Sequence, residues 1–390
     1  MKVVLLSNYL NHHQLPLCLA LVEKTGGNFT FIATKPISEM RLALGYRDMD
    51  RQYPFVLRAY ESEENRAQAQ KLMLEADVAI WMATLFDWIL PRLRAGKLSF
   101  DNSERLLRSN SSLPNIVAHM AKYSAPLILH QRNHYLLSIG AYAAGDYAGI
   151  RLFRNRAFRW GYFPNAVRYE PEELLRQKIP GRILWAGRLL ALKHPENAVL
   201  TAKRLRDEGI PFEMQVIGSG EQEETLRALI ADNGLQEHVT LLGAMTPEQV
   251  RRHMEEADVF LFTSDRREGW GAVVNEAMNS GCAVVASREC GSVPYLIQDG
   301  ENGLVFSAGD QAALDDCVLR LLRDAPWKRT LQERACRTIM EEWNAEVAAE
   351  RLLRLSEQLL ENENADPYAD GPCSRVPVMK SERVRASCPD

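Results

Sequence analysis

The sequence predicts an α/β protein made of two doubly wound domains. The chain has 390 residues, which is too long for one ordinary hydrophobic core and suits two domains of usual size. From about Gly181 onward, short β-branched runs alternate with helix-patterned stretches, and this alternation is typical of repeated βα units around a parallel sheet. The first half opens in the same way, so we expect the same architecture twice.

The second half has the clearer pattern. Its expected strands are short, apolar and bounded by Gly, Ser or Asp, as buried parallel strands are. They cover residues 183–186, 213–217, 239–242, 259–262 and 283–286. The expected helices cover residues 196–206, 221–232, 247–256 and 272–279. Right-handed crossovers place every strand-to-helix loop at the same edge of the sheet, where ligands of such folds bind.

The first half predicts a helix after Pro16 and strands over residues 3–6, 29–32 and 78–81, and it then becomes less regular. The segment Phe163-Pro164-Asn165 separates two periodic regions, which indicates a domain junction there. The expected units are a first domain over 1–165, a second over 166–341, a closing helix over 342–361 that packs back toward the first domain, and a flexible tail over 362–390.

Composition excludes several classes of protein. Apolar residues make up 46%, charged residues 25% and the formal net charge is −4, which is typical of a soluble globular protein and not of one that binds nucleic acid. No run approaches the roughly 18 apolar residues of a membrane-spanning helix. The opening MKVVLLSNYLNHH predicts a strand rather than a signal peptide, so we expect a cytoplasmic protein. The seven cysteines form no CxxC pair, which argues against a disulfide framework or a zinc site.

Two glutamates, Glu268 and Glu276, are separated by seven residues across one strand-to-helix loop. Gly269 and Gly271 between them permit positive φ and close approach of the backbone to a ligand. The helix that begins near Gly271 presents free N–H groups and a positive dipole end, which suit a diphosphate. Glu276 lies at the polar edge of that helix, where it can reach a ribose diol. The alternative is a pair of solvated surface glutamates.

Another loop of the same domain supplies cations. Arg188 follows Gly187 directly after an expected strand, and Lys193 comes five positions later. Arginine binds phosphate oxygens through a planar fork and lysine adds a compact charge, so together they can compensate a diphosphate. Solvated surface cations are the alternative. The turn Gly218-Ser-Gly220 opens another helix in a loop suited to close backbone approach to a nucleotide or sugar.

In order and spacing, these motifs resemble glycosyltransferase family four, the retaining transferases with the GT-B fold. The resemblance covers the second half and rests on Gly187-Arg188, Lys193, Gly218-Ser-Gly220, the E-x7-E element from Glu268 to Glu276, and the helix end Asn279-Ser-Gly-Cys-Ala-Val-Val. It implies two facing Rossmann-like domains with a cleft between them. Residues 1–165 would form the acceptor domain, and residues 166–341 the nucleotide-sugar donor domain.

The resemblance also implies a role for each residue. Arg188, Lys193 and Glu268 would be catalytic, with the two cations on the donor diphosphate and the glutamate beside the transferred sugar. Glu276 would bind the ribose hydroxyls. The other donor-binding residues would be Gly187, Gly218, Gly220, Gly269, Trp270, Gly271, Ala272 and Val273.

The implied activity is retaining, metal-independent transfer of a sugar from a nucleotide-diphosphate sugar, without a cofactor. The acceptor would be a glycan, a lipid-linked sugar or another hydroxyl compound, in the biosynthesis of surface polysaccharide or glycoconjugates. In the first domain, the sequence departs from the family pattern. Glu104 stands in the place of a histidine found in many relatives, and His12 and His13 occupy a loop that lacks the usual paired glycines. These three residues are candidates for acceptor or sugar binding, and capping or surface histidines are the alternative.

Two other functions stay open. A non-hydrolysing nucleotide-sugar epimerase-like enzyme also uses paired Rossmann domains, because fold alone does not determine chemistry, although the E-x7-E element disfavours it. A catalytically silent nucleotide-sugar-binding protein would keep only the donor half.

A basic and aromatic segment raises the question of membrane contact. It contains Arg151, Arg154, Arg156 and Arg159 among apolar side chains, a pattern that suits peripheral contact with anionic headgroups at the inner membrane face. The alternative is a helix whose aromatic side chains pack inward.

Overall fold

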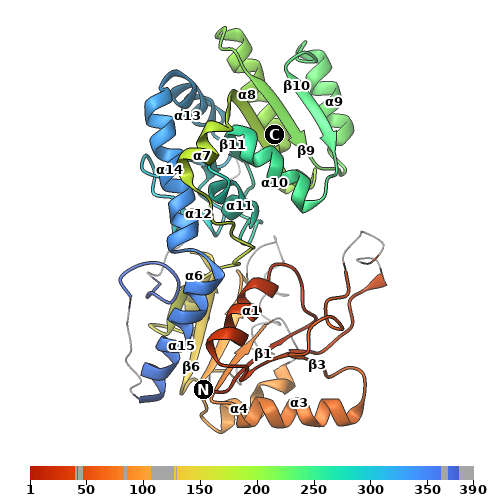
Figure 1. Cartoon of the computed structure of the whole chain (residues 1–390), viewed down its shortest axis with the longest axis vertical. Helices are drawn as coiled ribbons and strands as arrows, with labels where there is room; N and C mark the ends of the chain where they lie inside the picture. The colour runs from red at the N-terminus through yellow and green to blue at the C-terminus, as the bar shows by residue number, and fades with distance from the viewer. Residues whose placement is uncertain are drawn as a thin grey trace.

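The computed structural model describes residues 1–39, 42, 47–82, 86–106, 127–128, 130–361 and 368–376. Over these ranges the chain forms two lobes, each built on a parallel β-sheet, with the first lobe below the second in Figure 1. The predicted α/β fold with two doubly wound sheets is therefore confirmed.

The first sheet has the strand order β3-β2-β1-β4-β5-β6-β7, and all its neighbouring strands are parallel. Its strands are β1 (Val3–Ser7), β2 (Phe29–Ala33), β3 (Val56–Arg58), β4 (Val78–Trp81), β5 (Ser99–Ser103), β6 (His134–Ile139) and β7 (Ala157–Trp160). Its helical segments are α1 (Leu15–Lys24), α3 (Glu63–Glu75), η1 (Phe86–Trp88), α4 (Leu90–Arg94) and α6 (Ala143–Gly149). The strands predicted over 3–6, 29–32 and 78–81 are confirmed as β1, β2 and β4.

The second sheet has the order β10-β9-β8-β11-β12-β13 and is also parallel. Its strands are β8 (Ile179–Ala186), β9 (Glu213–Ile217), β10 (Val239–Gly243), β11 (Ala257–Phe262), β12 (Ala283–Ser287) and β13 (Leu304–Phe306). Its helical segments are α7 (Pro171–Arg176), η2 (Ala191–Lys193), α8 (Pro195–Asp207), α9 (Glu223–Asp232), α10 (Pro247–Glu256), α11 (Val273–Asn279), α12 (Val293–Leu296), α13 (Gln311–Arg323) and α14 (Ala325–Glu341). All five predicted strands and all four predicted helices of this half are confirmed.

The strand order of each sheet determines where loops meet. In the second sheet the chain runs outward from β8 to β10 and then returns to β11 on the other side of β8. Ligands of such sheets bind where the strand order reverses, at the carboxyl ends of the strands. In the first sheet the same reversal lies between β1 and β4. The loops after β1, β8 and β11 are therefore the places to look for a site.

An aromatic cluster joins the two lobes. Trp343, between α14 and α15 (Ala345–Glu361), lies with its ring centroid 6.3 Å from that of Phe163, 5.7 Å from Tyr295 and 6.0 Å from Trp270. All four side chains are buried. Gly161 leaves the space for Trp270, since a Cβ there would lie 2.2 Å from the indole ring. Residues from both lobes thus form one continuous apolar core at the junction.

A second contact between the lobes is made by backbone. The Ala141 N–H donates to the Gly291 carbonyl at 2.9 Å, and the Tyr142 hydroxyl donates to the Arg288 carbonyl at 2.6 Å. A Cβ on Gly140 would lie 2.8 Å from the Cα of Gly291, so glycine at both positions allows this close approach.

The end of the chain returns to the first lobe. Helix α15 packs beside α1, where Lys24 and Glu350 form an ion pair at 3.2 Å (Figure 1). Residues 368–376 differ from the flexible tail expected over 362–390. They run alongside β7, where Phe158 and Arg375 form an antiparallel bridge. Cys373 in this segment is buried. Strand β7 is the edge of its sheet, and this pairing satisfies backbone groups that the edge would otherwise leave open. The rest of the expected tail lies outside the described residues.

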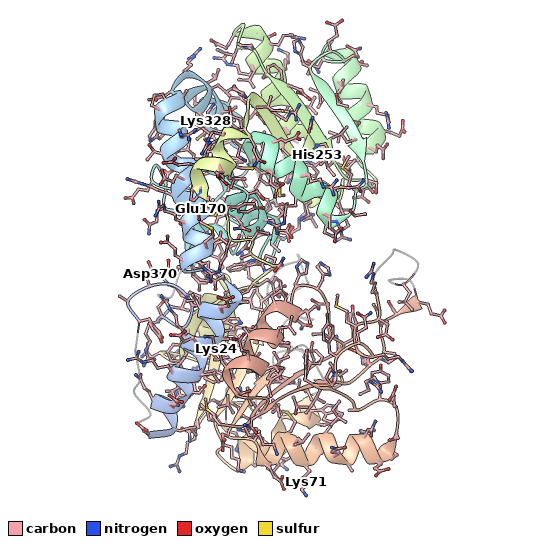
Figure 2. All side chains as sticks on the ribbon, viewed as in Figure 1. Lys24, Lys71, Glu170, His253, Lys328 and Asp370 are labelled. Atoms are coloured by element: carbon pink, nitrogen blue, oxygen red, sulfur yellow. The ribbon has the colours of Figure 1, made fainter. Side chains whose placement is uncertain are left out.

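The segment considered for membrane contact is not a helix and exposes little apolar surface. Its last residues form β7, and Leu152, Phe153, Phe158 and Trp160 are all at most 3% exposed. Arg159 pairs with Asp370, which lies beside the junction in Figure 2. The aromatic side chains pack inward, as in the alternative that we considered, and contact of this segment with a membrane stays a prediction. Within the described part of the chain, no helix is long and apolar enough to cross a bilayer.

A buried ion pair holds α14 on the second sheet. Asp258 on β11 accepts a hydrogen bond from Lys328 Nζ at 2.5 Å, from Gln332 Nε2 at 2.9 Å and from the Gly181 N–H at 2.9 Å. Both charged side chains are less than 10% exposed, and Lys328 lies inside the upper lobe (Figure 2). Removing one member of a buried pair leaves the other charge uncompensated.

We therefore expect Lys328→Met to lower the thermal unfolding midpoint by about 6–12 °C, which corresponds to a loss of about 3 kcal/mol. Circular dichroism during heating measures this change. The exposed neighbour Arg329 supplies the control, and Arg329→Met should stay within about 2 °C of wild type. An unchanged midpoint for Lys328→Met would show that the pair does not hold α14.

Candidate functional site

A cavity of about 400 Å³ lies at the carboxyl ends of β8, β9, β10 and β11. It is formed by the loops after these strands and by one loop of the first lobe. Most of the site residues predicted from the sequence line it, namely Gly187, Arg188, Lys193, Gly218, Glu268, Gly271, Ala272, Val273, Glu276 and His13. The reversal of strand order between β8 and β11 brings these distant segments together.

Two of the charged residues pair with each other. Lys193 Nζ donates a hydrogen bond to the Glu268 carboxylate, and the two side chains are 15% and 20% exposed. Arg188 is exposed and lines the same cavity. The cations and the carboxylate come from two different loops, after β8 and after β11. A ligand phosphate can therefore meet two positive groups at one end of the cavity.

Hydrogen bonds hold the loop of Lys193 against the loop of Glu268. Thr263 Oγ1 donates to the Lys193 carbonyl at 2.7 Å, and the Asp265 N–H donates to the Leu192 carbonyl at 2.9 Å. The His194 ring contacts Glu196 at 2.8 Å and Asp265 at 3.2 Å. These contacts determine where the Lys193 side chain begins.

The glycine turn after β9 is required by the packing of two loops. Gly218 has a φ of 140°, and a Cβ there would lie 1.8 Å from the Gly187 carbonyl oxygen. At Gly220 a Cβ would lie 2.4 Å from the Leu189 carbonyl oxygen. The two loops are also joined by the Leu189 N–H, which donates to the Ser219 carbonyl at 2.9 Å. Gly218 lines the cavity, whereas Gly220 serves the contact between loops.

Glu276 is half-buried on α11, where its side chain lines the cavity. Burial raises the pKa of this carboxyl above its ordinary value, and the positive charge of Arg251 opposes that rise. Arg251 lies on α10, so the environment of Glu276 depends on two helices. The sequence analysis did not identify Arg251.

The residues of the turn between the two glutamates face two different parts of the molecule. Gly271 lines the cavity with a φ of 81°, which glycine adopts without strain. Trp270 is 1% exposed, and its Nε1 donates to Asn275 Oδ1 at 2.9 Å. The Gly269 carbonyl faces Gly291 at the junction of the lobes. Packing between the lobes thus occupies the Trp270 side chain and the Gly269 carbonyl, and the donor-binding roles of these two residues stay predictions.

The first lobe brings together the three residues suggested for the acceptor. The rings of His12 and His13 lie 3.9 Å apart, and the His13 ring lies 5.9 Å from that of Tyr162. The Tyr162 hydroxyl donates to Glu104 Oε1 at 2.7 Å. His13 also lines the cavity, so this group extends it toward the first lobe. Tyr162 was missed, because strand β7, which ends two positions before it, was not predicted from the sequence.

Apolar residues also line the cavity. Ala244 and Met245 follow β10, and Val250 lies on α10. Such side chains can stack on a nucleobase, and their position after a strand was the signal that the sequence analysis did not use. Among the described residues, no group of three or more His, Cys, Asp or Glu side chains could hold a metal ion.

Comparison with known proteins identifies relatives of this arrangement. Residues 169–338, which hold most of the cavity, match the family model described as Glycosyl transferases group 1. The amylovoran biosynthesis glycosyltransferase AmsK of Erwinia amylovora is 32% identical over 206 residues, which are 52% of this chain and 50% of that protein. A GDP-mannose-dependent alpha-(1-6)-phosphatidylinositol monomannoside mannosyltransferase of Mycobacterium tuberculosis is 28% identical over 180 residues, 42% of this chain and 46% of that protein. The chain thus spans about half the length of these curated relatives.

Solved structures with the same fold cover nearly the whole chain. Anabaena HepE in complex with UDP matches 93% of this chain and 100% of its own, with a TM-score of 0.65 at 15% identity. Sucrose-phosphate synthase from Thermosynechococcus elongatus matches 93% and 99%, with a TM-score of 0.60 at 18% identity. At these identities the likeness concerns the fold, and it confirms the predicted GT-B architecture. The second lobe of the chain is thus similar to the glycosyl transferases group 1 family.

Proposed function

We propose that this protein is a retaining glycosyltransferase that moves a sugar from a nucleotide-diphosphate sugar to a hydroxyl acceptor. One observation carries the proposal: Arg188, Lys193, Glu268 and Glu276 come from three separate segments and line one cavity. The names of the relatives support it, since one describes a glycosyltransferase of amylovoran biosynthesis and the other a phosphatidylinositol monomannoside mannosyltransferase. The complex of HepE with UDP supports a nucleotide ligand.

In this proposal each end of the cavity binds one part of the donor. Arg188 and Lys193 bind the diphosphate, since guanidinium and ammonium groups match its charge. Glu276 accepts hydrogen bonds from the ribose diol, and Met245 with its apolar neighbours packs on the base. Glu268 is then beside the sugar. Lys193 exchanges its contact with Glu268 for the diphosphate, which releases the carboxylate to accept hydrogen bonds from sugar hydroxyls.

The chemical step depends on charge that develops on the leaving group. As the bond between sugar and diphosphate breaks, negative charge grows on the phosphate oxygens, and Arg188 and Lys193 stabilise it from fixed positions. The acceptor hydroxyl forms the new bond on the face from which the diphosphate leaves, so the configuration is retained. The proposal needs neither a metal ion nor a cofactor.

The acceptor in this proposal meets the donor from the first lobe, near His13, Tyr162 and Glu104. These polar groups suit the hydroxyls of a glycan or of a lipid-linked sugar, and the reaction would belong to surface polysaccharide or glycoconjugate biosynthesis in the cytoplasm.

A screen of sugar nucleotides tests the proposal. Thermal shift with UDP-linked and GDP-linked sugars identifies the donor, because a ligand that binds only the folded state stabilises it. The stabilising donor is then incubated with the protein, and release of nucleoside diphosphate is measured with and without glycan acceptors. Binding without turnover would indicate the silent binding protein. Absence of binding across the panel would contradict the proposed function.

Glu276→Ala should weaken donor binding about tenfold or more, since it removes an acceptor for the ribose hydroxyls. Isothermal titration calorimetry with the donor or its nucleoside diphosphate measures the change. The exposed Glu224 on α9 supplies a matched control, and Glu224→Ala should bind like wild type. Equal affinities for all three proteins would remove Glu276 from the site.

Arg188→Gln and Lys193→Gln should reduce kcat by about 100-fold, because they stabilise charge that grows in the transition state. KM should change less than kcat. Steady-state kinetics measure both constants, and Lys203→Gln, on the surface of α8, serves as the control. Full turnover in the two site variants would show that the leaving group is stabilised elsewhere.

His194 predicts a pH dependence of stability. Hydrogen bonds with Asp265 and Glu196 raise the pKa of His194 from 6.5 to about 9 in the folded protein. A raised pKa stabilises the fold fully below pH 6.5, and this contribution is lost as the pH rises through about 9. The midpoint difference between wild type and His194→Gln should therefore be largest near pH 6 and shrink toward pH 9.5. Differential scanning calorimetry across this range measures it, and a constant difference would rule out protonation as the cause.

A further inference from the structure

Arg251 on α10 contacts two other segments with one side chain. Its Nη2 donates to the Asn165 carbonyl at 2.8 Å, and its Nη1 donates to Asn279 Oδ1 at 3.1 Å. Asn165 lies in the segment that connects β7 to β8, where the chain passes from one lobe to the other. Asn279 is the last residue of α11. The planar fork of arginine makes both bonds at once, which the single ammonium of lysine does not reproduce.

Asn279 strengthens the same connection. Its side chain is 1% exposed and pairs twice with Val167: the Val167 N–H donates to Oδ1 at 2.8 Å, and Nδ2 donates to the Val167 carbonyl at 2.9 Å. The connecting segment is therefore bonded to α11 directly and also through Arg251. A displacement of residues 165–167 would act on the helix that carries Glu276.

Glu276 lies three positions before Asn279 on α11, and residues at this spacing are neighbours on one helix face. The charge of Arg251 acts on the Glu276 carboxylate and opposes the effect of its burial. Val250, the residue before Arg251, lines the cavity together with Glu276. Arg251 therefore belongs to the surroundings of the cavity while its bonds lead to the connecting segment.

We propose that Arg251 is a positioning residue that orients Glu276 toward the ribose and links donor binding to the segment between the lobes. This inference rests on the proposed function, in which Glu276 accepts hydrogen bonds from the ribose diol. If Arg251 acts through Glu276, substitution of Arg251 will weaken the binding only of ligands that carry the ribose hydroxyls that Glu276 binds. A general structural role would weaken all nucleotides alike.

The experiment pairs a variant of the protein with a variant of the ligand. Dissociation constants of UDP, GDP and their 2′,3′-dideoxy counterparts are measured by calorimetry for wild type, Arg251→Gln, Arg251→Lys and Arg252→Gln. Arg252 is the exposed neighbour on the same helix and provides the matched control. Thermal midpoints of all four proteins are recorded. If Arg251→Gln is poorly folded, Arg251→Lys takes its place in the comparison.

Wild type and Arg252→Gln should lose about tenfold in affinity when both ribose hydroxyls are removed. In Arg251→Gln the ribonucleotide should bind about tenfold more weakly, and the 2′,3′-dideoxy nucleotide should bind nearly as in wild type. Arg251→Lys should behave like Arg251→Gln, because it lacks the two-bond fork. Equal weakening of both nucleotides, or no weakening, would overturn the inference.

The failure of the proposed function gives a different result. If wild type binds none of the nucleotides, the nucleotide site itself is wrong, and the inference falls with it. If wild type binds ribonucleotides and 2′,3′-dideoxy nucleotides equally, the role of Glu276 at the ribose is wrong, and Arg251 has no such contact to orient. If wild type prefers the ribonucleotide and Arg251→Gln keeps the same preference, only the positioning role of Arg251 is contradicted.

Discussion

The parallel order of the second sheet is the constraint on which the candidate site depends. Strand β8 lies between β9 and β11, so the loops that follow these strands end at one edge of the sheet. This is why Arg188 and Glu276, far apart in the sequence, line the same cavity. The backbone groups of the buried strands pair with one another, and the loops carry the charged residues of the site. A site for a charged ligand follows from that division.

Contacts between loops then determine where the charges lie. The loop after β8 is hydrogen-bonded on one side to Ser219 and on the other to Asp265. The loops after β8 and β9 lie so close together that there is no room for a side chain at Gly218. Lys193 therefore projects from a segment that two neighbouring loops hold in place, and it meets Glu268, which lies on the same loop as Asp265. Charges in such fixed positions stabilise a developing charge without reorganisation, which is the main requirement for catalysis by electrostatics.

The turn between Glu268 and Glu276 belongs to two environments. Trp270 enters the aromatic junction with Trp343, where the two lobes share one core, while Gly271 faces the cavity. Arg251 and Asn279 add polar contacts from the connecting segment to the helix that ends this motif. The segment from Glu268 to the end of α11 therefore contacts the junction between the lobes at both of its ends. Its local structure depends on how the two lobes pack.

The sequence by itself determined the elements and the chemistry of the motif residues, and the tertiary structure decided their directions. Strand β9 and helix α10 have the predicted bounds because short buried strands and the capping pair Thr246-Pro247 are local signals. Arg188 and Glu276 were identifiable because loops after parallel strands meet at one edge. The burial of Trp270 and the contact of Val167 with Asn279, 112 positions apart, depend on how the lobes pack. Contacts over such separations leave no periodicity or spacing in the chain, so only the folded molecule shows them.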